Sequence, residues 1–253
     1  MSFSPRLYLP AVPPDAKEIA LDPMASHYLV KVLRLSEGTR FIGFDPQAFQ
    51  YELTLEKQDP AQAVVKVHSR TAPSLKLQGQ IALGQSLPKA SKMDTILRQG
   101  TEVGVHRFIP LVTQRSVSRP DDSGKDHKNE RWQKILVEAC RQCGRNDVPR
   151  LDAVTDWKDG LDLFAEFDHV LLPYEKEAPT LNTVLESKGP AGKILILIGP
   201  EGGWSPDEVK EASDRGACPI HLPTPILRTE TAGVVVVSMV RFFQSRSQEG
   251  IAR

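Results

Sequence analysis

Two apolar segments of this chain each run directly into a loop rich in glycine, proline and charged residues. Residues 194–198 enter the loop 199–203, and residues 219–222 enter the loop 223–233. Uninterrupted apolar runs are typical of strands that are covered on both faces, and ligands of such sheets bind beyond the carboxyl ends of the strands. The sequence therefore predicts a largely parallel sheet with its site in these two loops.

The first loop has three glycines within five residues and leads into a capped helix. Glycines allow backbone amides to approach a ligand closely, and Ser205, Pro206 and Glu208 form a capping-box pattern. Neither the P-loop pattern nor the dinucleotide fingerprint is present, and Glu201 would repel a phosphate. The loop suits a positively charged ligand such as an ammonium or a sulfonium, while an isolated glycine cluster is also compatible with a plain tight turn.

Four motifs resemble those of one family: residues 197–203, 227–232, 138–145 and 27–34. Together they cover nearly the whole chain, and they are similar to the RsmE family. This family consists of ribosomal RNA methyltransferases of the SPOUT class that methylate N3 of a uridine in small-subunit ribosomal RNA. One position departs from the pattern, since Gln99 stands where the family usually has lysine. Arg98 is a possible substitute for that lysine, and Gln99 is left out of the predicted site.

The resemblance implies an α/β fold with two domains. Residues 1–72 are expected to form a small PUA-like β-barrel that binds RNA, and short predicted strands at 40–44, 51–55 and 63–67 agree with a barrel. Residues 73–253 are expected to form a SPOUT methyltransferase domain with a mostly parallel sheet and a C-terminal trefoil knot.

Two boundaries follow from local sequence. Residues 69–74 are predicted to be the linker between the domains, and strands alternate with helices after it. The segment after Thr231 contains four consecutive valines, yet its length favours a buried helix, which Thr229 or Thr231 would cap.

The resemblance also implies S-adenosylmethionine as the cofactor, with no metal required. Its pocket is expected to consist of the segments that follow three strands, namely Leu172, Pro173, Ile198, Gly199, Pro200, Glu201, Gly202, Gly203, Leu222, Pro225, Ile226, Leu227, Thr231 and Ala232.

Methylation of uridine N3 requires that a proton with a pKa well above neutral is removed or that the resulting anion is stabilised. Arg228 is predicted to stabilise the anion, because arginine stays charged and does not act as an ordinary base. Glu230 or Glu138 is predicted to take the proton. The alternative for Arg228 is a salt bridge to Glu201 or Glu230 that merely holds the loop.

Charge distribution and resemblance point to an RNA partner, either small-subunit ribosomal RNA or the assembled subunit. The formal net charge is zero, but residues 86–150 carry 13 Lys and Arg against 8 Asp and Glu, while residues 151–253 carry 10 against 16. Such asymmetry is expected where one face meets phosphates. Arg34, Arg141 and Arg145 are predicted RNA contacts, and local ion pairs, such as one between Glu138 and Arg141, are the alternative.

A helix is predicted from about Arg131 to Cys143, with a buried stripe of Trp132, Ile135, Leu136, Ala139 and Cys143. Residues 121–126 are predicted to form an exposed loop. Cys140 and Cys143 have a spacing found in metal sites, but a structural zinc needs four ligands and no second pair is present, so both are interpreted as packing thiols.

The chain shows neither the apolar core of a signal peptide nor a window apolar enough to span a bilayer, which predicts a cytoplasmic protein. The resemblance implies a homodimer. Two alternatives are a methyltransferase acting on another RNA, at a transfer RNA base or a ribose hydroxyl, and a non-catalytic RNA-binding factor for ribosome assembly.

Overall fold

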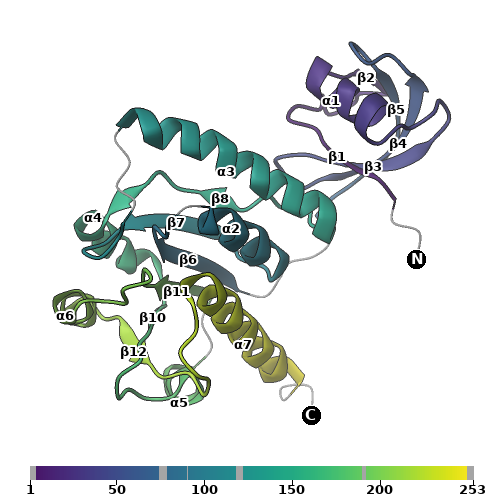
Figure 1. Ribbon diagram of the computed structural model, residues 1–253. Coiled ribbons are helices and arrows are strands. Elements are labelled where there is room, and N and C mark those ends of the chain that lie inside the picture. The colour runs from purple at the N-terminus through teal and green to yellow at the C-terminus, as the bar shows by residue number, and fades with distance from the viewer. Residues whose placement is uncertain (1–3, 74–78, 90, 118–121, 190–191, 250–253) are drawn as a thin grey trace. The chain divides into compact units, whose positions relative to one another are not determined.

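The computed structural model describes residues 4–73, 79–89, 91–117, 122–189 and 192–249 (Figure 1). The chain divides into two compact units. One comprises Met1–Lys76 and Val137–Val148, and the other comprises Leu77–Leu136 and Pro149–Arg253. Helix α3 (Asp122–Cys143) contributes residues to both units.

The first unit contains a five-stranded mixed sheet with the order β1-β3-β4-β5-β2. Its strand β1 is parallel to β3, and the other neighbours are antiparallel. The sheet and two short helices enclose a core with fully buried Leu7, Leu29 and Leu53. The elements are β1 (Arg6–Tyr8), β2 (Glu18–Ala20), α1 (Pro23–His27), the π-helix η1 (Tyr28–Val32), β3 (Arg40–Phe44), β4 (Gln50–Lys57) and β5 (Val64–Thr71).

The three strands predicted in this region are confirmed, but the predicted linker begins too early. Strand β5 continues to Thr71, because residues 69–71 pair with residues 50–52 of β4. Backbone pairing to a neighbouring strand therefore overrides the weak strand preference of this polar segment.

The second unit contains a parallel sheet with the order β12-β10-β11-β6-β7-β8, with β9 also paired to β7. This confirms the mostly parallel sheet. The remaining elements are β6 (Gln80–Ser86), α2 (Lys92–Glu102), β7 (Arg107–Val112), β8 (Arg150–Leu151), β9 (Thr155–Asp156), α4 (Trp157–Asp162), the 3-10 helix η2 (Leu163–Glu166), β10 (His169–Pro173), α5 (Leu181–Lys188), β11 (Lys193–Ile198), α6 (Pro206–Asp214), β12 (Cys218–Ile220) and α7 (Thr229–Glu249).

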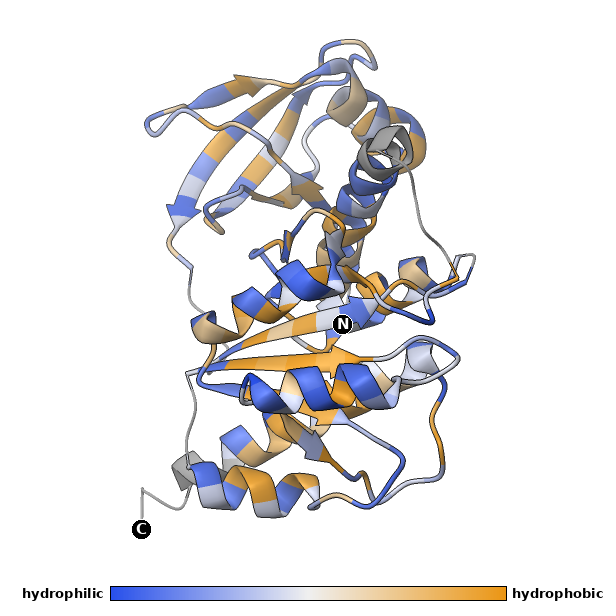
Figure 2. Cartoon of the chain, turned by 90° about the vertical axis from the view of Figure 1, so that its left-hand side faces the viewer, coloured by the Kyte–Doolittle hydropathy of each residue, from blue (hydrophilic) through white to orange (hydrophobic). Residues whose placement is uncertain are grey.

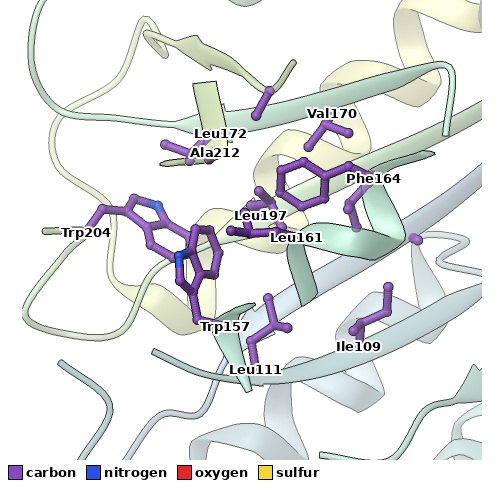
Figure 3. Packing of buried hydrophobic residues seen from close by; sticks show 13 residues of the cluster. Ile109, Leu111, Trp157, Leu161, Phe164, Val170, Leu172, Leu197, Trp204 and Ala212 are labelled. Carbon is purple, nitrogen blue, oxygen red and sulfur yellow. The ribbon is translucent and has the colours of Figure 1, made fainter. Parts of the chain in front are cut away.

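Helices cover both faces of this sheet. Helices α2 and α7 pack together over β6 and β11, and α4, η2 and α6 pack on the other face. In Figure 2 the central strands are hydrophobic along most of their length, whereas the covering helices alternate between polar and apolar residues. Figure 3 shows the second face, where Trp157 and Trp204 lie side by side with ring centroids 5.2 Å apart. Burial on both faces explains the uninterrupted apolar runs in the sequence.

Helix α3 ends at Cys143 as predicted, but its start and its buried stripe differ from the prediction. It starts at Asp122, so the part of the predicted loop that the structure describes, residues 122–126, is helical. Trp132, Leu136 and Ala139 are buried as predicted, but Cys140 occupies the buried stripe and Cys143 is exposed.

The helix predicted after Thr231 is confirmed as α7, which begins at Thr229. Its valines pack in the interior, with Val236, Val237 and Val240 fully buried. Tertiary packing therefore outweighs the strand propensity of the valine run. Thr229 makes a long-range bond that the sequence did not predict, as described below.

Candidate functional site

A cavity of about 580 Å³ lies beyond the carboxyl ends of β6, β10, β11 and β12. Parallel strands bring their carboxyl ends to one edge, so loops distant in sequence meet there. All lining residues belong to the second unit. The cavity is lined by Lys92, Pro173, Tyr174, Glu175, Ile198, Gly199, Pro200, Glu201, Gly202, Gly203, Trp204, His221, Leu222, Thr224, Pro225, Ile226, Leu227, Arg228, Thr229 and Ala232.

The glycine-rich loop forms a tight turn in which the Gly203 N–H donates to the Pro200 carbonyl at 2.9 Å. Gly203 has a φ of +68°, a left-handed conformation that side chains disfavour. Gly199 is needed for a different reason, since a Cβ there would lie 3.2 Å from Trp204 Nε1. The Arg115 guanidinium fixes the outer side of the turn by donating to the Gly202 carbonyl at 2.7 Å.

The capping box predicted after this loop is confirmed. The Ser205 hydroxyl accepts from the Glu208 N–H at 3.2 Å, and the Glu208 carboxylate accepts from the Ser205 N–H at 2.9 Å. The same carboxylate accepts from the Gln114 N–H at 2.7 Å. The start of α6 is thereby tied to the loop after β7, which makes the glycine turn part of a rigid frame.

We expect Gly203→Ala to weaken cofactor binding by about tenfold, because a left-handed conformation costs a side chain roughly 1–2 kcal/mol and the loop would move to avoid it. Gly202→Ala is the matched control, since its added Cβ would lie in ordinary contact 3.4 Å from Arg115 Cδ. Calorimetric titration of both variants measures the difference. Equal affinities in the two variants would show that the turn tolerates a side chain at Gly203.

The beginning of α7 is joined to the glycine-rich loop and to β6 by hydrogen bonds of the buried Thr229. The Thr229 hydroxyl donates to the Gly199 carbonyl at 2.6 Å and accepts from Gln85 Nε2 at 3.0 Å. Gln85 is fully buried at the end of β6, and its amide also donates to the Ser86 carbonyl at 2.9 Å. The loops after β11 and β12 are therefore both attached to the central strand β6.

An ionic cluster lies at the cavity and joins three segments. Lys92 Nζ lies 3.0 Å from Glu201 Oε1 and 3.1 Å from Glu230 Oε2, and Glu201 Oε1 also accepts from the Lys89 N–H at 3.1 Å. Hydrogen bonds to Glu201 and then Glu230 raise the pKa of Lys92, which keeps it charged.

Both carboxylates of this cluster stay ionised more readily than ordinary glutamates. Burial alone would raise the pKa of Glu201, but backbone N–H groups and Lys92 lower it below its ordinary value. Burial also raises the pKa of Glu230, but hydrogen bonds from its own backbone N–H and from Lys92 lower this pKa below the ordinary value. The resting site therefore holds two carboxylates and one ammonium.

Arg228 lines the cavity with an exposed side chain, and among the described residues it takes part in no salt bridge. Glu201 and Glu230 pair with Lys92, so the loop-holding salt bridge considered for Arg228 is made by another residue. Arg228 still acts on Glu230 as a positive charge and lowers its pKa.

Comparison with known proteins assigns the chain to a family. Residues 75–241 match the family model of the RNA methyltransferase domain. Over 221 residues the chain is 32% identical to ribosomal RNA small subunit methyltransferase E of Bacillus subtilis, which covers 85% of this chain and 86% of that protein. The chain belongs to the ribosomal RNA small subunit methyltransferase E family.

Other members of the methyltransferase E family agree in sequence and structure. The protein of this name from Synechocystis is 31% identical over 216 residues, covering 85% of this chain and 69% of that protein. The crystal structure of the Neisseria gonorrhoeae protein, bound to S-adenosyl methionine, is 26% identical with a TM-score of 0.86, covering 95% of this chain and 98% of that one.

Most residues predicted for the cofactor pocket of this methyltransferase E family member lie around the cavity. The two exceptions are Leu172, which is fully buried in the core, and Thr231, which is exposed in the first turn of α7 and does not line the cavity. The sequence analysis did not identify Lys92 as a site residue. A signal for it was present, because Lys92 follows the carboxyl end of the buried strand β6, just as the glycine-rich loop follows β11, and ligands bind at such ends.

The other predicted residues lie in the first unit. Glu138 Oε2 pairs with Arg141 Nη1 at 3.2 Å, and the Arg141 guanidinium stacks over the Tyr28 ring at 4.4 Å. Arg145 pairs with Asp147 at 2.6 Å, with only 10% of its side chain exposed. Arg34 is exposed and has a positive φ of 53°. No observation assigns these side chains a role in catalysis or RNA binding, which stays a prediction.

The described residues contain no helix whose length and apolar character suffice for crossing a membrane. They also contain no group of three or more His, Cys, Asp or Glu side chains arranged to hold a metal ion.

Proposed function

We propose that this chain transfers the methyl group of S-adenosylmethionine to N3 of a specific uridine in small-subunit ribosomal RNA. The observation that carries the proposal is the cavity at the carboxyl edge of the parallel sheet, in a chain that belongs to the methyltransferase E family. The related N. gonorrhoeae structure contains the same cofactor.

The residues around the cavity fit this cofactor. A volume of about 580 Å³ falls within the range of roughly 300–1,000 Å³ that is usual for small-molecule sites. Pro173, Leu222 and Leu227 offer apolar walls for an adenine ring, and the backbone of residues 199–203 offers polar groups for its edges. Glu201 supplies a negatively charged carboxylate, which attracts a positively charged sulfonium.

When bound, the cofactor supplies an electrophilic methyl group. The chain itself must deal with the N3 proton and with the charge that develops on the base. Arg228 is positioned at the cavity with its guanidinium unpaired within the described part of the chain, so it is available to stabilise the uridine anion. Of the two proposed proton acceptors, Glu230 belongs to the same unit as the cavity. Glu138 is the second.

We further infer the finer properties that the family resemblance implies. The chain after β12 returns to the centre of the sheet, where α7 packs on β6 and β11, and this course supports the proposed trefoil knot of a SPOUT fold. The mixed sheet of the first unit supports a PUA-like RNA-binding role with Arg34, Arg141 and Arg145 as contacts. A cytoplasmic homodimer that acts on ribosomal RNA or the assembled subunit completes the proposal.

Mass-spectrometric mapping of ribosomal RNA tests this function. In a strain that lacks the gene, one uridine of the small-subunit RNA should lose its base methyl group, and the gene should restore it while an Arg228→Ala variant should not. Loss of a transfer RNA or ribose methylation instead would favour another acceptor. Unchanged RNA in all samples, together with no cofactor binding by calorimetry, would favour a non-catalytic assembly factor.

A further inference from the structure

Lys92 is a single cation shared by two carboxylates from different loops. Glu201 lies in the loop after β11 and Glu230 lies in the first turn of α7, and both are within 3.1 Å of Lys92 Nζ. Their side chains are 24% and 20% exposed, and that of Lys92 is 34% exposed. Formal charges of +1, −1 and −1 leave the cluster with a net charge of −1.

The surroundings leave this net charge largely in place. The neighbouring backbone N–H of Lys89 carries no formal charge, and Arg228 acts on Glu230 without forming an ion pair among the described residues. Glu175, another acidic lining residue, lies against Gly203. Without Lys92, the cluster would carry two neighbouring negative charges, and no other ion pair of the described residues neutralises them.

We propose that Lys92 sets the charge selectivity of the cofactor pocket by offsetting one of two carboxylates, so that the site still favours the sulfonium cofactor over its neutral thioether product without holding the sulfonium too tightly. This inference rests on the proposed function. In the reaction, the bond between the methyl carbon and sulfur breaks with its electron pair staying on sulfur, a bond from that carbon to N3 forms, and the N3 proton passes to the proposed acceptor, Glu230 or Glu138. The sulfur thereby loses its positive charge.

This selectivity has a consequence for turnover. A cluster of net charge −1 attracts the sulfonium before the reaction and no longer gains that attraction afterwards, which favours exchange of product for fresh cofactor. A cluster of charge −2 would hold the sulfonium more tightly still, and a neutral cluster would not distinguish the two ligands by charge. Lys92 is thus a specificity-determining residue that acts through the charge of the pocket, in contact with Glu230, one of the two proposed proton acceptors.

The test is calorimetric titration of S-adenosylmethionine and S-adenosylhomocysteine at about pH 8, where glutamates are ionised. The quantity of interest is the ratio of the two affinities. Lys92→Met should raise the preference for the sulfonium on the order of fivefold at low salt, and the gain should shrink as salt is added. Lys92→Arg should keep the wild-type ratio. Lys89→Met is the matched control, because Lys89 bonds to Glu201 through its backbone alone among the described contacts.

A charge-restoring pair makes the test independent of any single variant. Glu230→Gln should lower the preference for the sulfonium, and the double variant Lys92→Met with Glu230→Gln should return it to the wild-type value, since the net charge is again −1. If Lys92→Met weakens both ligands equally, Lys92 is only a tether and the inference is wrong. If the wild-type protein binds neither ligand, the proposed function fails, and this inference fails with it.

Discussion

Replacing Arg228 by lysine should reduce single-turnover methylation by about a hundredfold while cofactor affinity changes less than about twofold. Lysine keeps the charge but lacks the planar fork that can contact two acceptor atoms of a uridine anion. The Arg228 side chain is exposed at the cavity, and Lys92 already pairs with the two nearby carboxylates, so the loop does not depend on this guanidinium.

The measurement combines single-turnover rates at saturating RNA and cofactor with a cofactor titration of the same variant. Arg215→Lys is the control, because Arg215 forms a surface ion pair with Asp162. A parallel fall in rate and cofactor affinity for Arg228→Lys would show that the arginine supports the loop and does not act on the base.

Replacing Thr229 by valine should lower the free energy of unfolding by about 3 kcal/mol and weaken cofactor binding at the same time. Valine has the same shape, but it leaves the Gly199 carbonyl without this donor and removes an acceptor of the buried Gln85 amide. Each unsatisfied buried group costs roughly 1–3 kcal/mol. The cofactor effect follows because Gly199 lines the cavity.

Urea unfolding measures the first effect, through a lower midpoint with an unchanged slope. Thr229→Ser keeps the hydroxyl and should retain most of the stability and affinity. Wild-type stability in Thr229→Val would mean that water or a shifted backbone replaces both hydrogen bonds.

The parts of the fold that were predicted correctly have local signals. The apolar runs gave the parallel strands, and the spacing of Ser205 and Glu208 gave the capping box, because each pattern acts within a few residues. The errors concern long-range packing. The predicted buried face of α3 included Cys143, which is exposed, and omitted Cys140, which is buried. The hydrogen bond from the Thr229 hydroxyl to Gly199 cannot be predicted from the sequence around Thr229, because its partner comes from a distant loop.

The candidate site shows the same division. The glycine loop and Arg228 were found because they follow apolar segments, whereas Lys92 is an ordinary lysine at a helix start until the fold brings Glu201 and Glu230 to it. A charge that depends on partners from two distant loops has no signature in its own neighbourhood. The sequence indicated the place of the cavity, and the structure was needed to reveal the ion pairs within it.

Attachment of α7 to β6 and to the loop after β11 also determines when the cavity comes into existence. Gln85 and Thr229 are 144 residues apart in the sequence, and the ion pair between Lys92 and Glu230 joins two similarly distant segments. Contacts between such distant segments form slowly because a long stretch of chain must first be closed. Competence to bind the cofactor therefore arises late in folding, once α7 has packed onto β6 and the loop after β11.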